Sequence, residues 1–154
     1  MAVIFQMNLL LHIKHVIFDH LFFSEKKVNM IMEGYFTTII YSNPSFSMNG
    51  IFISCPFKPL SKGYPKNILF FDVASNKELI HRLCILEKQL LQYFCQTFMI
   101  TNKTPVYNIR SQLQNGSMKY YKEPGAVSSR YYIKISGIWE NPTEMGITFK
   151  LVEY

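Results

Sequence analysis

The segment Arg130-Tyr131-Tyr132-Ile133-Lys134-Ile135-Ser136-Gly137 carries the clearest structural signal in the chain. Tyr131, Ile133 and Ile135 alternate with Arg130, Tyr132 and Lys134, which is the period of a β-strand with two different faces. Asn141-Pro142 then marks a turn, and residues 145–152 alternate in the same way. The two stretches therefore predict a closing β-hairpin at the end of the chain.

Upstream of this hairpin, the pattern predicts further strands and two helices. Residues rich in β-branched and aromatic side chains indicate strands over 35–41, 51–55, 67–73 and 117–122. Leucine and phenylalanine at helical spacing predict a long helix over 75–98, with Ser75-x-x-Glu78 as a capping box. Thr104-Pro105 and Asn115-Gly116 resemble the start and stop of a shorter helix over 105–114.

This order of elements predicts an α+β, mainly β fold. A five-stranded OB-like Greek-key barrel has its helix between strands 3 and 4, as here, and OB barrels bind oligonucleotides on one face. We expect two parts in the chain: an apolar N-terminal extension, residues 1–33, and an OB-like nucleic-acid-binding domain, residues 34–154.

Composition excludes several classes of protein. The chain has 154 residues, 49% of them hydrophobic and only 17% charged, so it can bury a core and is not intrinsically disordered. Seven glycines and seven prolines are too few for a collagen-like chain. Three cysteines without a CxxC motif are typical of reduced thiols, which predicts an intracellular protein of the nucleus or cytoplasm. Charged and histidine residues interrupt the apolar first 23 residues, so we expect no membrane span.

Positive charge and aromatic rings coincide in one region. The net charge is +6, and between Thr101 and Lys134 six basic residues face a single acid, Glu123. Lysine and arginine attract phosphates, and tyrosine rings stack on unpaired bases. We therefore expect a nucleic-acid-binding face formed by Lys119, Tyr120, Tyr121, Lys122, Arg130, Tyr132, Lys134, Trp139 and Lys150. The alternative for the same pattern is a solvated edge hairpin whose lysines prevent edge pairing, and for Trp139 it is a core plug before a turn.

Motifs of catalysis and metal binding are missing from the sequence. No GxGxxG, GxxxxGK[ST], HExxH or GxSxG motif occurs. His81, Cys84, Cys95 and Cys55 do not have the tight spacing of zinc ligands. Glu140 and Glu144 flank the last turn, where solvated carboxylates are the simplest interpretation. We therefore expect no enzyme activity, no metal and no cofactor.

The last hairpin also resembles a known group of proteins. Tyr132-Ile133-Lys134-Ile135-Ser136-Gly137-Ile138-Trp139-Glu140 and Gly146-Ile147-Thr148-Phe149-Lys150-Leu151 are similar to the closing hairpin in small proteins of large double-stranded DNA viruses of arthropods. Some of these look like OB-fold single-stranded DNA-binding proteins. The resemblance implies a viral accessory protein of replication or recombination, and Lys134, Trp139 and Lys150 are the matching residues with suitable chemistry. The acidic tail of many phage-type single-strand binders is missing here, which puts tail-mediated partners in doubt.

The sequence thus predicts a non-enzymatic protein that binds single-stranded nucleic acid with little sequence specificity, DNA being favoured over RNA. Homo-oligomers are compatible with it. One alternative is a viral structural or assembly protein that self-associates through apolar and aromatic surfaces. The other is a subunit that supplies DNA affinity to a catalytic partner.

Overall fold

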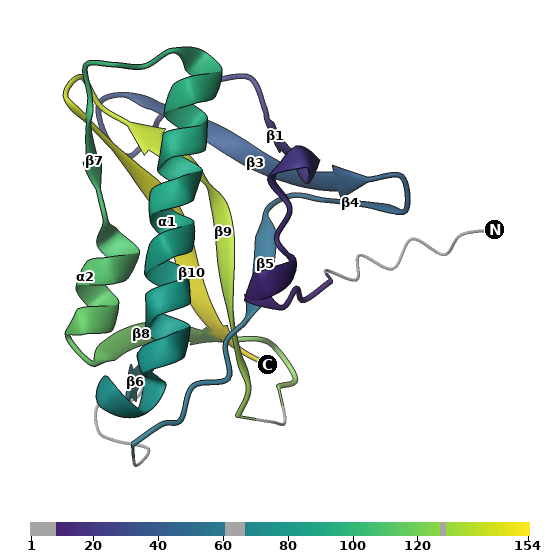
Figure 1. The fold of residues 1–154 in the computed structure, drawn as a ribbon, viewed down its shortest axis with the longest axis vertical. Helices are drawn as coiled ribbons and strands as arrows, with labels where there is room; N and C mark the ends of the chain where they lie inside the picture. Colours follow the sequence, from purple (N-terminus) through teal and green to yellow (C-terminus); the bar gives the residue numbers. More distant parts are fainter. Residues whose placement is uncertain (1–8, 61–66, 127–128) are drawn as a thin grey trace.

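A computed structural model describes residues 9–60, 67–126 and 129–154 (Figure 1). Its strands are β1 (Leu21–Phe23), β2 (Lys27–Val28), β3 (Tyr35–Asn43), β4 (Phe46–Met48), β5 (Ile51–Ser54), β6 (Ile68–Phe70), β7 (Thr104–Val106), β8 (Ser117–Lys122), β9 (Tyr131–Glu140) and β10 (Glu144–Glu153). The helices are α1 (Lys77–Phe98) and α2 (Asn108–Gln114), with 3-10 turns η1 (Ile13–His15), η2 (Phe18–His20) and η3 (Ala74–Asn76).

The described strands form one mixed sheet. Its main path runs β1-β3-β9-β10-β8-β6, with β2 and β4 paired to β3, β5 paired to β9 and β7 paired to β10. The predicted hairpin is confirmed, since β9 and β10 pair antiparallel along almost their whole length, from Met145 opposite Glu140 to Glu153 opposite Tyr131. On its other edge β10 pairs in parallel with β7 and β8.

The expected five-stranded OB barrel is wrong. The sheet has ten strands and is not closed, because β1 and β6 end its main path without pairing to each other. The far edge of β10 is occupied by β7 and β8, so the sheet continues outward there instead of returning to the first strands. What holds is the coarser prediction: a strand-rich mixed α/β fold with one long helix, which lies between β6 and β7.

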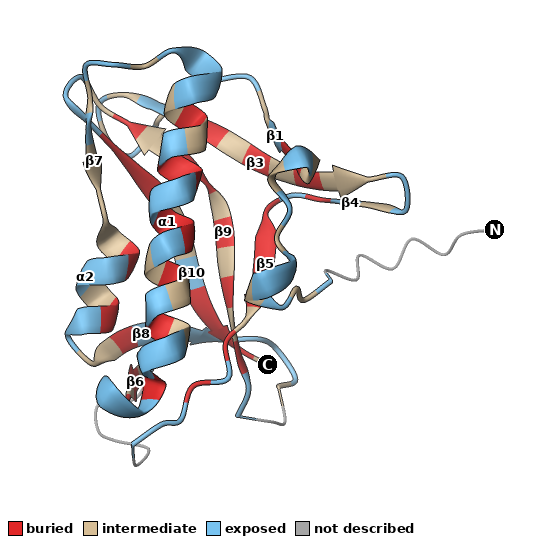
Figure 2. Ribbon diagram, viewed as in Figure 1, coloured by how far each residue is buried: buried red, intermediate tan, exposed pale blue. Residues whose placement is uncertain are grey.

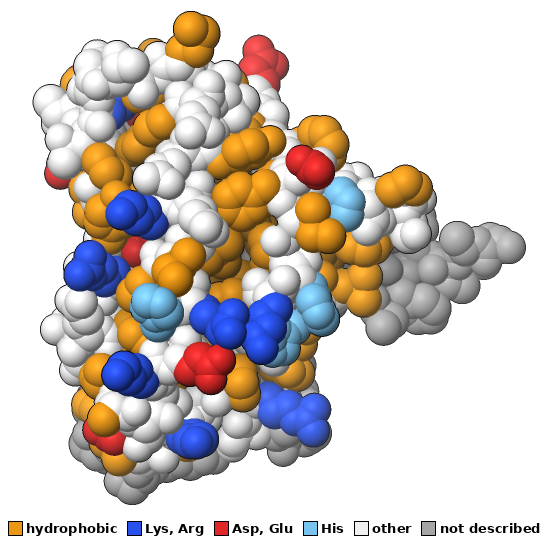
Figure 3. All heavy atoms as spheres, viewed as in Figure 1, with side chains coloured by type: hydrophobic (Ala, Val, Ile, Leu, Met, Phe, Trp, Pro, Cys, Tyr) orange, Lys and Arg blue, Asp and Glu red, His pale blue; other side chains and the backbone are white. Residues whose placement is uncertain are grey.

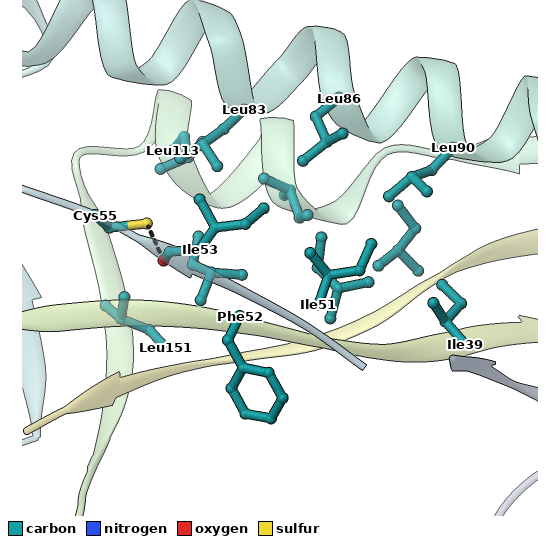
Figure 4. Close-up of a cluster of buried hydrophobic side chains, with 14 of the residues drawn as sticks. Ile39, Ile51, Phe52, Ile53, Cys55, Leu83, Leu86, Leu90, Leu113 and Leu151 are labelled. Atoms are coloured by element: carbon teal, nitrogen blue, oxygen red, sulfur yellow. Dashed lines mark hydrogen bonds between the residues drawn. The ribbon is translucent and has the colours of Figure 1, made fainter. Parts of the chain in front are cut away.

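The core lies between the sheet and one face of α1 (Figures 2 and 4). Buried side chains recur on α1 at helical spacing, and in Figure 4 those of Leu83, Leu86 and Leu90 lie over Ile51 and Ile53 of β5. Burial of apolar area is the main favourable contribution to folding. The alternation of β3 and β9 follows from the same packing, because every second side chain reaches the core.

The ends of the helices differ from the expectation in detail. Ser75 does not cap α1, because its backbone N and its hydroxyl both donate to Asp72 Oδ2, at 3.1 and 2.6 Å. Thr104-Pro105 does not start a helix, since Thr104–Val106 pairs with Glu144–Gly146 of β10 and α2 begins only at Asn108.

Part of the apolar N-terminal segment pairs with the sheet. β1 lies antiparallel to β3 and Leu21 is buried. Leu11 forms a bridge with Ile53 of β5. Independent folding of residues 34–154, which the boundary at residue 33 implies, stays a prediction. Within the described residues, no helix is both long and apolar enough to cross a bilayer.

Candidate nucleic-acid interface

The sheet has a second face, directed away from α1, which we call the outer face. Figure 4 shows the Phe52 ring on this side, opposite the isoleucines that meet the helix. Residues directly opposite each other in a ladder share a face. Lys134 of β9 is opposite Phe52, and Lys150 of β10 is opposite Lys134, so both lysines belong to the outer face. Both lysines were predicted to belong to one face of the closing hairpin, and the register places them side by side.

Cations and rings are paired across this face. Lys134 Nζ lies 5.5 Å from the centroid of the Phe52 ring. On β8, the Tyr121 ring has Lys119 Nζ at 5.2 Å and Lys150 Nζ at 5.7 Å from its centroid. These are cation–π distances. The five residues form a band across β5, β9, β10 and β8, which we call the basic strip: Phe52, Lys134, Lys150, Tyr121 and Lys119.

A groove opens beside the strip at the edge of β10. β7 pairs with residues 144–146 and β8 with residues 151–153, and no described strand pairs with β10 on this side between them. The gap forms a groove of about 380 Å³. Its polar and aromatic lining consists of Lys119, Tyr121, Trp139, Thr148, Phe149 and Lys150 from the sheet, and Asn108 and Gln112 from α2.

Trp139 is positioned in this groove by a glycine opposite it. Gly146 is its partner in the ladder, and a Cβ atom at Gly146 would lie 2.6 Å from the Trp139 ring. The ring therefore lies directly on the backbone of β10, which only glycine permits. Trp139 is half-buried there, so it is neither a plug of the core behind the sheet nor a fully exposed platform.

The predicted site residues do not all come together. Lys119, Tyr121, Trp139 and Lys150 line the groove, and Lys134 extends the strip. Tyr132 is on the outer face, opposite Ser54, but its ring already contacts Phe52 and Tyr154, with centroids at 5.8 and 5.4 Å.

The remaining predicted residues lie elsewhere. Tyr120 points to the other face, where its ring contacts Tyr131 at 5.5 Å. Lys122 is opposite Glu153 at the end of the ladder, and Arg130 lies before β9; both are exposed.

Lys103, one of the six basic residues between Thr101 and Lys134, is engaged in an ion pair with Glu140. Lys103 Nζ lies 2.8 Å from Glu140 Oε1, and Lys26 Nζ lies 3.0 Å from Oε2. Burial alone would raise the pKa of Glu140, but hydrogen bonds and charges from both lysines outweigh it and lower the pKa below its ordinary value. Glu140 is thus a buried structural carboxylate and not the solvated turn residue that its position suggested.

Two tyrosines of β9 have raised pKa values. Burial, Glu123 and Tyr154 raise the pKa of Tyr132. Burial also raises the pKa of Tyr131, whose hydroxyl donates to Glu153 Oε2 at 3.0 Å.

The predicted site residues did not include five residues of this surface: Phe52, Asn108, Gln112, Thr148 and Phe149. Phe52 is part of a run of apolar residues and carries no sign of which face it occupies. Asn108 and Gln112 lie on α2, one turn apart, and only the parallel pairing of β7 and β8 with β10 brings them to the groove. The i, i+4 spacing of two amides is the one signal that could have indicated them.

A metal centre is not formed by the described residues, in which no group of three or more histidine, cysteine or acidic side chains is placed to hold an ion. Burial raises the pKa of the Cys55 thiol to about 12, and the pKa values of Cys84 and Cys95 are raised for the same reason. The buried Cys55 thiol is therefore a poor nucleophile, while Cys84 and Cys95 are partly accessible. Comparisons with protein-family models, curated proteins and solved structures find no match for this chain.

Proposed function

We propose that this protein binds single-stranded DNA with little sequence specificity, through the basic strip and the adjoining groove. The observation that carries the proposal is the convergence of Lys119, Lys134 and Lys150 with the Tyr121 ring on one face of the sheet. Lysine side chains would contact phosphates, while the exposed Tyr121 ring and the Trp139 ring would stack on bases.

The groove favours a flexible strand over a duplex. The half-buried Trp139 ring lies against the backbone of β10, so a base must leave its stack to reach it. Asn108 and Gln112 offer both donors and acceptors, which any base edge can use. This arrangement supports binding with little preference among sequences.

A titration with labelled oligothymidylate tests the proposal. We expect saturable anisotropy, weaker binding to a duplex of the same length, and a change in the emission of Trp139, the single tryptophan of the chain. Three phosphate contacts predict a slope of about −2 for the logarithm of affinity against the logarithm of salt concentration. Equal affinity for the duplex, or binding that salt does not weaken, would overturn the proposal.

A second candidate is a structural or assembly protein that self-associates. It is favoured by the apolar side chains exposed near β2, of which Met30 is 92% and Ile31 97% exposed. Exposed apolar patches are typical of protein–protein contacts. Light scattering after size exclusion would favour this candidate if the chain forms oligomers that dissociate in the double variant Met30→Ser, Ile31→Ser. A monomeric chain would exclude it.

A further inference from the structure

A separate groove lies between the two helices, on the face opposite to the basic strip. It has a volume of about 470 Å³ and runs along α1 beside α2. Figure 3 shows this side of the molecule, where Lys and Arg side chains gather around apolar ones over the lower half of α1. Volumes of this size are typical of sites for small molecules between helices.

The floor of the groove is apolar and partly exposed. Val73, which precedes α1, is 39% exposed, and Ile85 of α1 is 41% exposed. Ile80 and Cys84 of α1 also line the floor. The half-buried Tyr107 closes the groove from the side of α2. An aliphatic chain placed here would cover apolar surface that now contacts water.

The rim of the groove is basic. Lys77, Lys88 and Arg110 line it, with His81 between the two lysines, and none of the described residues that line it is acidic. Lys77 and Lys88 lie about three turns apart on the same side of α1, about 16 Å along its axis. The neighbouring Glu87 is directed inward, where its two carboxylate oxygens accept from the backbone N–H groups of Ile109 and Arg110 at 2.8 and 3.0 Å. Its charge is therefore already engaged by α2.

We propose that this groove binds a small amphiphilic anion, a single aliphatic chain with one anionic head group. The apolar floor would take the chain, and Arg110 and Lys88 would both hold the head group through charge-assisted hydrogen bonds. A nucleotide fits less well, since the described residues that line the groove offer one aromatic ring, Tyr107, besides the imidazole of His81. The proposal does not depend on DNA binding, because none of the residues of the basic strip lines this groove.

Calorimetry with dodecanoate, below its micellar concentration, tests the proposal. We expect saturable binding to one site, at least about tenfold weaker in Lys88→Gln and in Arg110→Gln, as expected for the loss of one hydrogen bond to a charged group. Arg82→Gln is the matched control, because Arg82 lies on α1, pairs with Glu78 and does not line the groove. Octyl glucoside, which has a chain but no charge, should not compete.

Alkylation of the cysteines gives an independent readout. Cys84 lines the groove. Cys95 lies about three turns further along α1, where its Sγ is 3.5 Å from Met145 Sδ. Dodecanoate should slow the reaction of Cys84 with iodoacetamide and leave Cys95 unchanged. No saturable binding, equal weakening by Arg82→Gln, or protection of Cys84 by adenosine monophosphate as strong as that by dodecanoate would overturn the proposal.

Discussion

Tyr121 is the residue on which the basic strip depends most. Tyr121 is 49% exposed, and the ammonium groups of Lys119 and Lys150 lie 5.2 and 5.7 Å from the centroid of its ring. The lysines leave part of the ring open and place two positive charges where the phosphates next to a stacked base would lie. The same residue on the other face of β8 would be useless for binding, as the position of Tyr120 shows.

Substitution of Tyr121 by leucine removes the aromatic surface and keeps an apolar side chain. Stacking contributes about 1–3 kcal/mol per base, so we expect oligothymidylate affinity to fall about 5- to 150-fold in anisotropy titrations. Tyr35→Leu is the matched control, because Tyr35 is 46% exposed and also has a lysine, Lys26, at 5.3 Å from its ring. If both variants weaken binding equally, exposed tyrosines in general and not the strip would be responsible.

At the scale of elements, α2 is held by one carboxylate of α1. Glu87 is fully buried and accepts from the first backbone N–H groups of α2. Glutamine offers one acceptor oxygen in place of two, so we expect Glu87→Gln to lower the free energy of unfolding by about 1–3 kcal/mol in urea denaturation. Glu78→Gln breaks only the exposed pair with Arg82 and should cost less than about 1 kcal/mol. A larger loss in Glu78→Gln than in Glu87→Gln would contradict this assignment.

The end of the β9–β10 hairpin is held by Glu140 with Lys26 and Lys103. Because both lysines lower its pKa in the folded state, the carboxylate contributes stability above its unfolded pKa, near 4.3. That contribution is lost as the pH falls through the lowered folded value. Unfolding at pH 7 should therefore cost about 1–3 kcal/mol less in Glu140→Gln than in the unmodified protein. The difference between the two proteins should shrink as the pH falls below the unfolded pKa, and a difference that stays constant with pH would refute the ionic role.

Elements were easier to predict than their connections. The strands at 35–43, 51–54, 117–122, 131–140 and 144–153 and both helices follow from local spacing and side-chain type. Parallel pairing cannot be found in this way, because Thr104-Pro105 has the local chemistry of a helix start and becomes a strand only through contact with Glu144–Gly146. That long-range contact extends the sheet beyond β10 in place of the expected barrel closure. It also leaves the gap beside β10 and brings Asn108 and Gln112 to it.

The candidate site was predictable only as far as the alternation of β9 and β10 extends. Lys134 and Lys150 are neighbours because their strands alternate in register. The predicted binding face included Tyr120, Lys122 and Arg130 because they are basic or aromatic. In the structure Tyr120 is on the other face of β8, Lys122 is at the end of its ladder and Arg130 precedes β9, so none of them joins the strip. The ion pairs of Glu140 join residues far apart in the chain, so no local pattern indicates them.

The whole molecule has basic groups on both sides of the sheet, and its net charge alone does not locate a binding site. Lys119, Lys134 and Lys150 occupy the outer face, while Lys77, Lys88 and Arg110 surround the groove of the helices. Long-range attraction of a polyanion follows from the total charge of +6. Direct contact between the strand and the basic strip, in contrast, depends on the presence of Lys119, Lys134 and Lys150.

The most direct measurement is therefore the salt dependence of oligothymidylate binding in two triple variants of equal charge. Lys119→Gln, Lys134→Gln and Lys150→Gln together remove the lysines of the basic strip. Lys14→Gln, Lys27→Gln and Lys58→Gln together remove three exposed lysines elsewhere. We predict that the first variant loses most of the salt slope, which falls from about −2 toward zero, while the second keeps it with a modest decrease in affinity. An equal loss in both variants would show that strand binding, if present, depends on overall charge and not on the outer face of this sheet.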